Sequence, residues 1–242
     1  MNGHTRQLPA LAANCTISVI IPIYNEIELL PIVLEHLRVL PLNLELILVD
    51  DGSNDGTEQF LETQKHLPNC QVVRHSQNRG KGSAIVSGLK VATGDIIIIQ
   101  DADMEYTPSD IVSVIEPIID GKTNVCFGSR FLGKIDGMRL PNRIANYFLA
   151  FFVSALFGQR ITDEATAYKA FRREIIKEIP LTCKGFEFCP EVTAKVLLTG
   201  EKILEIPVNY SARTFEEGKK IGYRDFFVAI KTMLKCRFLK NG

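Results

Sequence analysis

The chain has 242 residues, of which 46% are hydrophobic and 23% are charged, so it can bury a sizeable core as one large α/β domain or two small ones. Its 28 basic residues balance its 28 acidic residues, and this formal net charge of +0 excludes a general nucleic-acid-binding protein, which needs an excess of positive charge. The six cysteines form no CxxC pair and no cluster with histidine, which argues against a zinc site and suits a reducing, cytoplasmic compartment.

No stretch of the sequence is expected to cross a membrane. The longest apolar-rich stretch, residues 144–157, is too short for a spanning helix and contains Asn146 and Ser154. Residues 1–14 carry little charge and no long apolar core, so we expect no signal peptide. The chain should therefore stay in solution or contact a membrane only at its surface.

Strands and helices alternate over the first part of the chain. Apolar runs predict strands at 17–23, 44–49, 72–75 and 96–99, and apolar residues at helical spacing predict a helix after each of the first three. Asn54 or Asp55 is placed to cap the second of these helices. This alternation predicts a parallel, doubly wound sheet that binds ligands at the carboxyl ends of its strands. Polar motifs at 22–26, 50–57 and 101–103 should therefore meet at one edge of the sheet.

Two carboxylates follow the fourth predicted strand. The isoleucine run 96–99 leads directly to Asp101 and Asp103, and a short β-branched run of this kind predicts a strand buried on both faces. Two carboxylates one residue apart repel each other unless a cation lies between them or water solvates both. Mg²⁺ or Mn²⁺ suits such oxygen ligands and usually brings phosphates with it. A solvated acidic turn at a strand end is the alternative.

Two common phosphate-binding motifs are missing from the sequence. No GxGxxG motif follows the first strand, which disfavours a dinucleotide site. The segment Gly80-Lys81-Gly82 lacks the earlier glycine of a P-loop. It is more typical of a tight strand-to-helix turn, from which Lys81 could approach a phosphate.

The second half of the chain is less regular. The pattern predicts helices at 108–119, 144–157 and 190–198, strands at 124–128 and 203–208, and an edge strand or short element within 162–171. Basic residues dominate from Lys219 to Lys240, where Asp225 is the one acid. On a helical wheel of about 100° per residue, Arg224, Lys231 and Lys235 fall together, and Phe227, Ile230, Leu234 and Phe238 gather on another side. This pattern is typical of a helix at a membrane surface, and equally of a C-terminal helix docked on the domain with its basic face in water.

Taken together, these motifs resemble family-2 glycosyltransferases with the GT-A fold. The resemblance rests on residues 19–26, 49–53 with Asp55 and Thr57, 78–82, 101–103 and 128–131. Residues 210–213 and 216–221 narrow it to dolichyl-phosphate mannose synthases and bacterial polyprenyl-phosphate hexosyltransferases. It covers roughly residues 17–238 and implies a Rossmann-like, mostly parallel sheet flanked by helices, with an amphipathic C-terminal helix.

The resemblance also implies a division of the chain. Residues 1–16 would be an N-terminal extension and residues 17–242 a single domain. Within that domain, 17–130 would be the nucleotide-sugar-binding half, and 131–242 the acceptor-binding half with its basic amphipathic tail.

The resemblance implies roles for individual residues as well. The donor-binding residues would be Pro22, Tyr24, Glu26, Val49, Asp51, Asp101, Ala102, Arg213 and Lys219. The metal ligands would be Asp101, Asp103 and Glu105, where Glu105 replaces the Gln common in mannose synthases and adds negative charge. Arg130 would meet the acceptor phosphate, with Arg139 and Arg143 as second candidates.

The resemblance implies a metal-dependent, inverting transfer of mannose or glucose from a GDP- or UDP-hexose to a polyprenyl (dolichyl-type) phosphate, and the chemistry of the residues agrees with it. Mg²⁺ or Mn²⁺ on Asp101 and Asp103, with Arg213 and Lys219, would stabilise the charge that develops on the leaving diphosphate. A lipid phosphate is already an anion and needs no general base. A hydroxyl acceptor needs one, and Asp163 or Glu164 is then the candidate, with Glu187 as a weaker one.

Asp103, Arg130 and Asp163 are thus the predicted catalytic residues. Two alternatives stay open: transfer to a saccharide or small-molecule hydroxyl, and a non-catalytic nucleotide-sugar-binding subunit. We expect a cytoplasmic protein with peripheral contact at the cytoplasmic membrane face. The sequence does not predict an oligomeric state.

Overall fold

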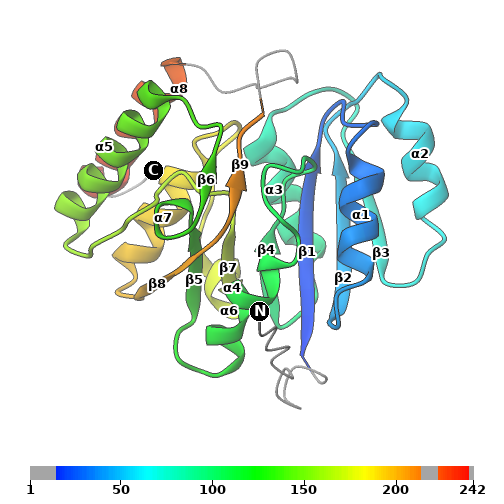
Figure 1. Ribbon diagram of the computed structural model, residues 1–242, viewed down its shortest axis with the longest axis horizontal. Coiled ribbons are helices and arrows are strands. Elements are labelled where there is room, and N and C mark those ends of the chain that lie inside the picture. Colours follow the sequence, from blue (N-terminus) through cyan, green and yellow to red (C-terminus); the bar gives the residue numbers. More distant parts are fainter. Residues whose placement is uncertain (1–14, 214–222, 240–242) are drawn as a thin grey trace.

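The computed structural model of the chain describes residues 15–213 and 223–239 (Figure 1). The strands of the main sheet are β1 (Thr16–Ile23), β2 (Asn43–Asp50), β3 (Cys70–Arg74), β4 (Ile96–Ile99), β5 (Val125–Ser129), β7 (Lys169–Arg172) and β8 (Ile203–Pro207). The helices are α1 (Leu30–Arg38), α2 (Thr57–Gln64), α3 (Lys81–Val91), α4 (Asp110–Ile119), α5 (Leu140–Phe157), α6 (Arg173–Glu178), α7 (Phe188–Leu198) and α8 (Tyr223–Phe238). Two short strands, β6 (Ile135–Asp136) and β9 (Tyr210–Ser211), pair with each other beside the sheet.

The main sheet has seven strands in the order β3-β2-β1-β4-β7-β5-β8. Its first four strands in the chain pair in parallel, as the strand–helix alternation predicts, with Ile17 opposite both Leu44 and Ile96. The four isoleucines of β4 are all buried, because helices cover both faces of the sheet. The predicted α/β class and the mostly parallel sheet are confirmed.

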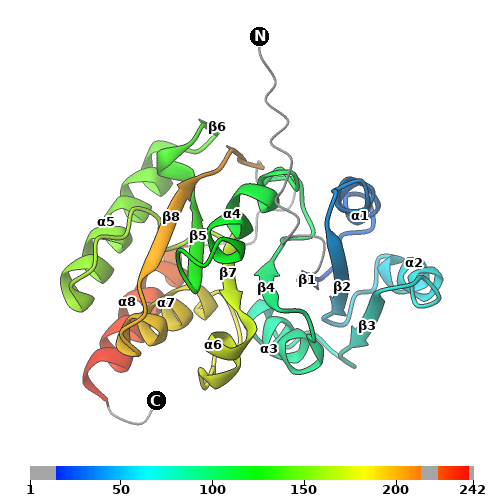
Figure 2. The same cartoon turned by 90° about the horizontal axis from the view of Figure 1, so that it is seen from below.

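Two hydrophobic clusters hold the layers together, one on each face of the sheet. One cluster includes Leu30, Leu34 and Val114 and joins α1, α2 and α4 to the sheet. The other joins α3, α5, α6, α7 and α8 to the opposite face (Figure 2). Alternate side chains of one buried strand enter different clusters: Ile98 the first and Ile99 the second. The apolar runs of the sequence therefore reflect burial on both faces.

The strand expected at an edge lies inside the sheet. β7 pairs antiparallel with β4 on one side and with β5 on the other. Ala170 and Phe171 are fully buried, and so is Lys169. The edge-strand alternative was wrong, because tertiary partners satisfy Lys169 inside the sheet, whereas the alternative of a short element is confirmed by this strand of four residues. Likewise β8 is not the last strand, since β9 follows it.

The start of α2 also differs from the prediction. Gly56 holds the N-cap position with φ of 100°, a left-handed conformation that glycine adopts without steric cost. Asp55 lies one residue earlier, and its carboxylate accepts a hydrogen bond from the Thr57 amide at 3.0 Å. Asp55 therefore caps the helix from outside the N-cap position, and Asn54 does not.

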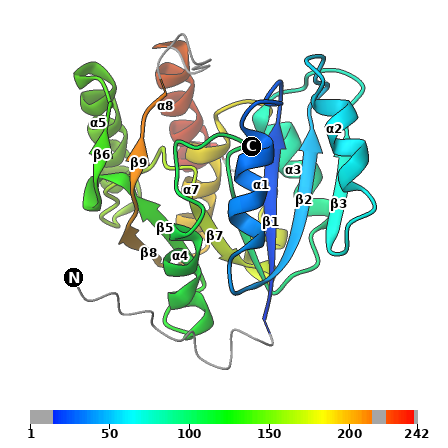
Figure 3. The ribbon, with the colours of Figure 1, turned by 45° about the vertical axis from the view of Figure 1, so that its right-hand side comes forward.

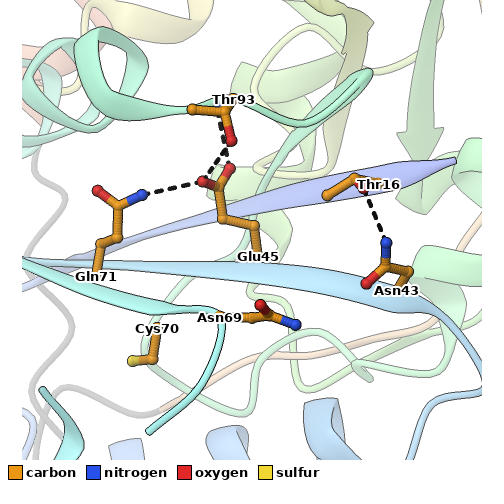
Figure 4. A pocket seen from close by; sticks show the side chains of 7 residues that line it. All are labelled: Thr16, Asn43, Glu45, Asn69, Cys70, Gln71 and Thr93. Atoms are coloured by element: carbon orange, nitrogen blue, oxygen red, sulfur yellow. Dashed lines mark hydrogen bonds between the residues drawn. The ribbon is translucent and has the colours of Figure 1, made fainter. Parts of the chain in front are cut away.

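A polar hollow of about 340 Å³ lies at the amino ends of β1, β2 and β3. Its lining residues are Thr16, Asn43, Glu45, Asn69, Cys70, Gln71 and Thr93 (Figure 4). Both oxygens of Glu45 already accept hydrogen bonds, from Gln71 and Thr93 among others. The hollow thus surrounds a carboxylate that joins neighbouring strands, at the end of the sheet away from the polar motifs.

Candidate active site

The polar motifs that follow β1, β2 and β4 lie at the carboxyl edge of the sheet, the upper edge in Figure 1. This shared edge follows from parallel pairing, because parallel strands end on the same side. Asp51 follows β2, and Asp101 and Asp103 follow β4. The arrangement brings together residues that are far apart in the sequence.

Asp51 organises the loop that leads into α3. Its carboxylate accepts hydrogen bonds from the backbone amides of Arg79 at 2.9 Å and Gly80 at 2.7 Å, and it lies 2.6 Å from Nδ1 of His75. Asp51 is 2% exposed, so its predicted contact with the donor base would have to come past these partners. The sequence reading missed His75, whose position one residue after β3 was the available signal.

The turn at Gly80 places Lys81 beside the carboxylates. Gly80 has φ of 95°, and a Cβ there would collide with the Lys184 carbonyl, so the position requires glycine. Lys81 begins α3, and its Nζ lies 2.5 Å from Oδ1 of Asp101. An incoming phosphate oxygen would therefore compete with Asp101 for the Lys81 ammonium.

Arg213 binds carboxylates of this cluster through both its guanidinium and its backbone amide. Its guanidinium donates to Glu26, with both nitrogen–oxygen distances 3.1 Å, and to Oδ2 of Asp103 at 2.7 Å. Its backbone amide donates to Glu105 at 2.8 Å. Arg213 thus joins the turn after β1 to the turn after β4, and the charges of Glu26 and Asp103 raise its pKa further despite its burial.

Asp103 carries the most perturbed carboxyl of this cluster. Burial raises the pKa of Asp103 to about 7, with further increases from the negative charges of Asp101 and Glu105 and a partial offset from Arg213. A carboxyl held in this way gains from any added positive charge. The cluster therefore has the electrostatic character of a cation site.

The cluster suits a divalent ion with two protein ligands. Within residues 15–213 and 223–239, no group of three or more His, Cys, Asp or Glu side chains is arranged to hold a metal. Glu105, the third predicted ligand, instead accepts a hydrogen bond from the Arg213 amide. Mg²⁺ is commonly held by one or two carboxylates together with substrate phosphates, so Asp101 and Asp103 fit that pattern.

The remaining predicted donor residues have different degrees of access. Pro22 is buried, Ala102 is 4% exposed and Val49 is fully buried in the core. Any donor contact at Val49 would therefore come from its main chain. Tyr24 is half-buried beside the turn after β1. Lys219 lies outside the described residues.

Arg130 and Asp163 form a buried, two-point ion pair. Nε of Arg130 donates to Oδ2 of Asp163 and Nη2 donates to Oδ1, each at 2.7 Å, and the Arg130 amide adds a bond of 2.9 Å. Asp163 is fully buried and Arg130 is 6% exposed. The guanidinium carbon also lies 5.1 Å from the ring centre of Tyr210.

This pairing changes the prediction for both residues. Both oxygens of Asp163 are engaged by Arg130 and no part of the side chain reaches solvent, which argues against a general base there. The Nε side of Arg130 faces Asp163, so only its other side is left for a phosphate. The geometry makes Asp163 the group that positions Arg130.

The other two candidate bases, Glu187 and Glu164, are also poorly placed to act as general bases. Glu187 accepts the backbone amides of Lys184 at 2.8 Å and Gly185 at 3.0 Å, so it holds a loop. Glu164 is 1% exposed, and neither of its carboxylate oxygens has a hydrogen-bond partner among the residues that the structure describes. Burial raises the pKa of Glu164 to about 7, with Lys169 acting in the opposite direction. Neither residue is an open carboxylate beside Arg130.

Lys169 is a buried lysine that contacts Glu164, and the sequence did not predict its role. Its Nζ donates to the Glu164 carbonyl at 2.8 Å and to the Thr193 hydroxyl at 3.3 Å, and it lies 3.7 Å from the ring centre of Phe127. Burial lowers the pKa of Lys169. A lysine flanked by apolar residues was the available signal for this buried position.

Arg139 and Arg143 lie at the start of α5 and are both exposed. Arg143 lies over Tyr147 at 6.0 Å, the Tyr147 ring is 4.3 Å from Phe131, and Arg130 lies over Phe131 at 5.9 Å. A continuous row of contacts therefore joins Arg143 to Arg130.

The sequence and the fold of the chain are similar to those of known proteins. The family model "Glycosyl transferase family 2" matches residues 18–180. The chain is 30% identical over 214 residues to "Dolichol-phosphate mannosyltransferase" of Pyrococcus furiosus, a match that covers 85% of this chain and 59% of the relative. It thus spans less than two thirds of that relative's length.

Two further relatives match over most of their length. "Undecaprenyl-phosphate mannosyltransferase" of Micrococcus luteus is 28% identical, covering 84% of this chain and 86% of the relative. "UDP-N-acetylglucosamine--dolichyl-phosphate N-acetylglucosaminyltransferase" of Methanococcus voltae is 30% identical, covering 89% and 95%.

The fold has solved counterparts. Glucosyl-3-phosphoglycerate synthase from Mycobacterium tuberculosis, in complex with Mn²⁺, UDP and glucosyl-3-phosphoglycerate, superposes with a TM-score of 0.73 at 19% identity, covering 98% of this chain and 84% of that one. This likeness confirms the GT-A fold. With the family match over residues 18–180, it supports one conclusion: the chain belongs to glycosyltransferase family 2.

Proposed function

We propose that the chain transfers mannose or glucose, with inversion, from a GDP- or UDP-hexose to a polyprenyl phosphate of the dolichyl type. The observation that carries the acceptor is the sequence likeness to three proteins named for polyprenyl phosphates, each over at least 84% of this chain. Since the chain spans 59% of the Pyrococcus relative, that relative's complete activity is part of the proposal.

On the donor side, the chain's own cations would receive the diphosphate. Lys81 and Arg213 are each held by carboxylates at the carboxyl edge, at 2.5 Å from Asp101 and 2.7 Å from Asp103. Asp101 and Asp103 would hold Mg²⁺ or Mn²⁺, which supplies positive charge to the leaving diphosphate. Arg213 would exchange a carboxylate for a phosphate oxygen and stabilise the same charge.

On the acceptor side, a lipid phosphate needs orientation and no proton removal. Asp163 fixes Arg130 through two side-chain contacts, and this fixed guanidinium would position the phosphate for attack. The partners of Asp163 and Glu187, and the burial of Glu164, favour this acceptor over a hydroxyl. A single displacement then inverts the anomeric centre.

One test decides the acceptor. The protein is incubated with each common nucleotide sugar, Mg²⁺ or Mn²⁺, and a short-chain, water-soluble polyprenyl phosphate, and the lipid fraction is analysed by mass spectrometry. We expect a lipid-phosphate hexose with one donor, and loss of product on chelation of the metal. Absence of lipid-linked sugar with every donor contradicts the proposal.

UDP-N-acetylglucosamine is a second donor candidate. The Methanococcus voltae relative, whose name specifies that donor, is 30% identical and matched over 95% of its length. The same assay distinguishes the donors, because the mass of the product identifies the sugar.

A further inference from the structure

The outer surface of α5 carries a stripe of large apolar side chains. Its exposed apolar residues are Leu140, Ile144, Tyr147, Phe148 and Phe151. At about 100° per residue they lie within about 100° of one another, on one side of the helix. Phe151 is 70% exposed and Leu140 is 68% exposed, while Leu149 and Val153 point into the core. The helix is therefore apolar on its outer side as well as its inner side.

Helix α8 has a second stripe of the same kind. Tyr223, Phe227, Leu234 and Phe238 are exposed and fall within about 60° of one another on the helical wheel. Phe227 is 66% exposed and Phe238 is 69% exposed. Ala229 and Met233 are on the buried side. A helix docked on the domain by one face thus leaves a separate apolar stripe in water.

The two helices lie side by side (Figure 3), and ring contacts join their apolar stripes. The ring of Phe148 on α5 lies 5.7 Å from that of Phe226 on α8, which lies 5.5 Å from Phe227. We name this surface the α5–α8 face. Contiguous exposed apolar surface of this extent marks an interaction site rather than ordinary surface composition.

Basic side chains flank the α5–α8 face. Arg224, Lys231 and Lys235 of α8 are exposed and fall next to its apolar stripe, about 80° to 120° from Tyr223 on the wheel. Arg143 adds an exposed cation on α5. Over their described lengths, α5 has no acidic residue and α8 has only Asp225. Aromatic side chains beside a cationic border complement the interface of an anionic bilayer.

The α5–α8 face is continuous with the candidate acceptor site. Tyr147 belongs to the face, and its ring lies 4.3 Å from Phe131, which follows Arg130 directly. A surface bound at this face would therefore lie beside the guanidinium held by Asp163. A second copy of the chain fits the face poorly, because a symmetric contact would bring like positive charges together.

We propose that the α5–α8 face docks on an anionic lipid bilayer and presents the membrane surface to Arg130. The inference deepens the proposed function, because it names the partner from which a lipid acceptor would enter. The apolar stripes of the α5–α8 face insert between lipids, and its basic residues contact the headgroups. Docking requires neither donor nor metal, so it is measured separately from transfer.

Vesicle binding tests the proposal. The protein is sedimented with phosphatidylcholine vesicles that contain or lack phosphatidylglycerol. We expect binding to the anionic vesicles, and a tenfold or greater loss for the double variant Phe151→Ser/Phe227→Ser. Lys231→Glu/Lys235→Glu should lose the preference for anionic vesicles. Val39→Ser removes a side chain that is 77% exposed at the end of α1, and it should bind as the parent does.

Activity separates this inference from the proposed function. The Phe151→Ser/Phe227→Ser variant should transfer sugar to a soluble, short-chain polyprenyl phosphate at the parent rate, and to a vesicle-embedded acceptor at least tenfold more slowly. No vesicle binding by the parent, or equal binding by parent and variants, overturns the docking surface whatever the transferase result. A concentration-dependent dimer of the parent that Phe151→Ser abolishes also overturns it, because the face is then an interface between copies.

Discussion

The proposed donor and acceptor sides of the site hold their charges in different ways. At the donor side, the Lys81 and Asp101 side chains are 23% and 15% exposed, and Arg213 is shared between Glu26 and Asp103. At the acceptor side, the Arg130 and Asp163 side chains are 7% and 0% exposed, and two hydrogen bonds join the guanidinium to the carboxylate. Partly exposed pairs can exchange partners when an anion arrives, whereas a buried pair is costly to open. The comparison therefore predicts exchangeable donor contacts and a fixed acceptor contact.

The largest expected effect is on the acceptor side. Asp163→Ala leaves the buried Arg130 charge without its partner and should lower the free energy of unfolding by about 3–5 kcal/mol. Urea denaturation measures this loss. Asp101→Ala is the matched control, because it removes one partner of a partly exposed pair and should cost only about 1 kcal/mol or less. Equal losses in the two variants would remove the distinction between the two sides.

The next largest effect concerns the buried carboxyl of Glu164. Glu164 has a pKa raised from 4.5 to about 7 in the folded chain, so the unfolded chain ionises first as pH rises. Between about pH 4.5 and pH 7 the folded chain therefore binds more protons than the unfolded chain, and the stability that protonated Glu164 contributes is lost as pH rises through this range. Glu164→Gln removes that loss, and at pH 8 it should raise the free energy of unfolding by about 3 kcal/mol.

The pH profile of unfolding checks the Glu164 prediction. The groups that act on Glu164 are Lys169, Asp163 and Arg130, in addition to burial. All three are retained in the variant, so the difference between the parent and Glu164→Gln isolates Glu164. A difference that is constant from pH 4.5 to pH 8 contradicts a raised pKa.

At the donor side, Asp103→Asn should have a smaller effect on the free energy of unfolding but a clear effect on turnover. Asp103→Asn removes a charge that Asp101 and Glu105 oppose, so stability at pH 8 should not fall. Turnover should fall on the order of 100-fold, because stabilisation of the leaving diphosphate is lost. Stability and turnover thus move independently here. Unchanged turnover contradicts the assignment of Asp103 to the donor site.

The smallest effect is expected for Lys81→Met. Its pair with Asp101 is partly exposed, so the free energy of unfolding should change by about 1 kcal/mol or less. The KM for the nucleotide sugar should rise about tenfold, since a direct phosphate contact is worth about that factor. Lys90→Met, on the exposed side of the same helix, serves as the control. A KM that does not change would indicate that Asp101 keeps Lys81 away from the donor.

The donor side was more predictable from sequence than the acceptor side. The strands β1, β2 and β4 are apolar runs that end in polar motifs, and parallel pairing alone brings Asp51, Asp101 and Asp103 to one edge. The Arg130–Asp163 pair spans 33 positions, and no local pattern relates the two residues. The internal position of β7 was missed for the same reason, because Lys169 is buried through contacts with Thr193 and Phe127.

The predicted site residues divide in the same way. Arg213 and Asp103 come together in the structure, and Asp101 meets Lys81, which was considered only as a phosphate contact. The predicted metal role of Glu105 is not visible in its hydrogen bonding, since its carboxylate binds the Arg213 amide. Side-chain orientation at the end of a turn depends on its partners, and the sequence does not specify those.

The bridge from Arg213 to Glu26 has a consequence for synthesis of the chain. The two residues are 187 positions apart, and a ribosome adds about 5–20 residues per second. The first strand and its turn therefore leave the ribosome roughly 10–40 s before the arginine that joins them to Asp103. Asp103 is 110 positions before Arg213, so for part of that interval the nascent chain contains Glu26 and Asp103 without the guanidinium that joins them.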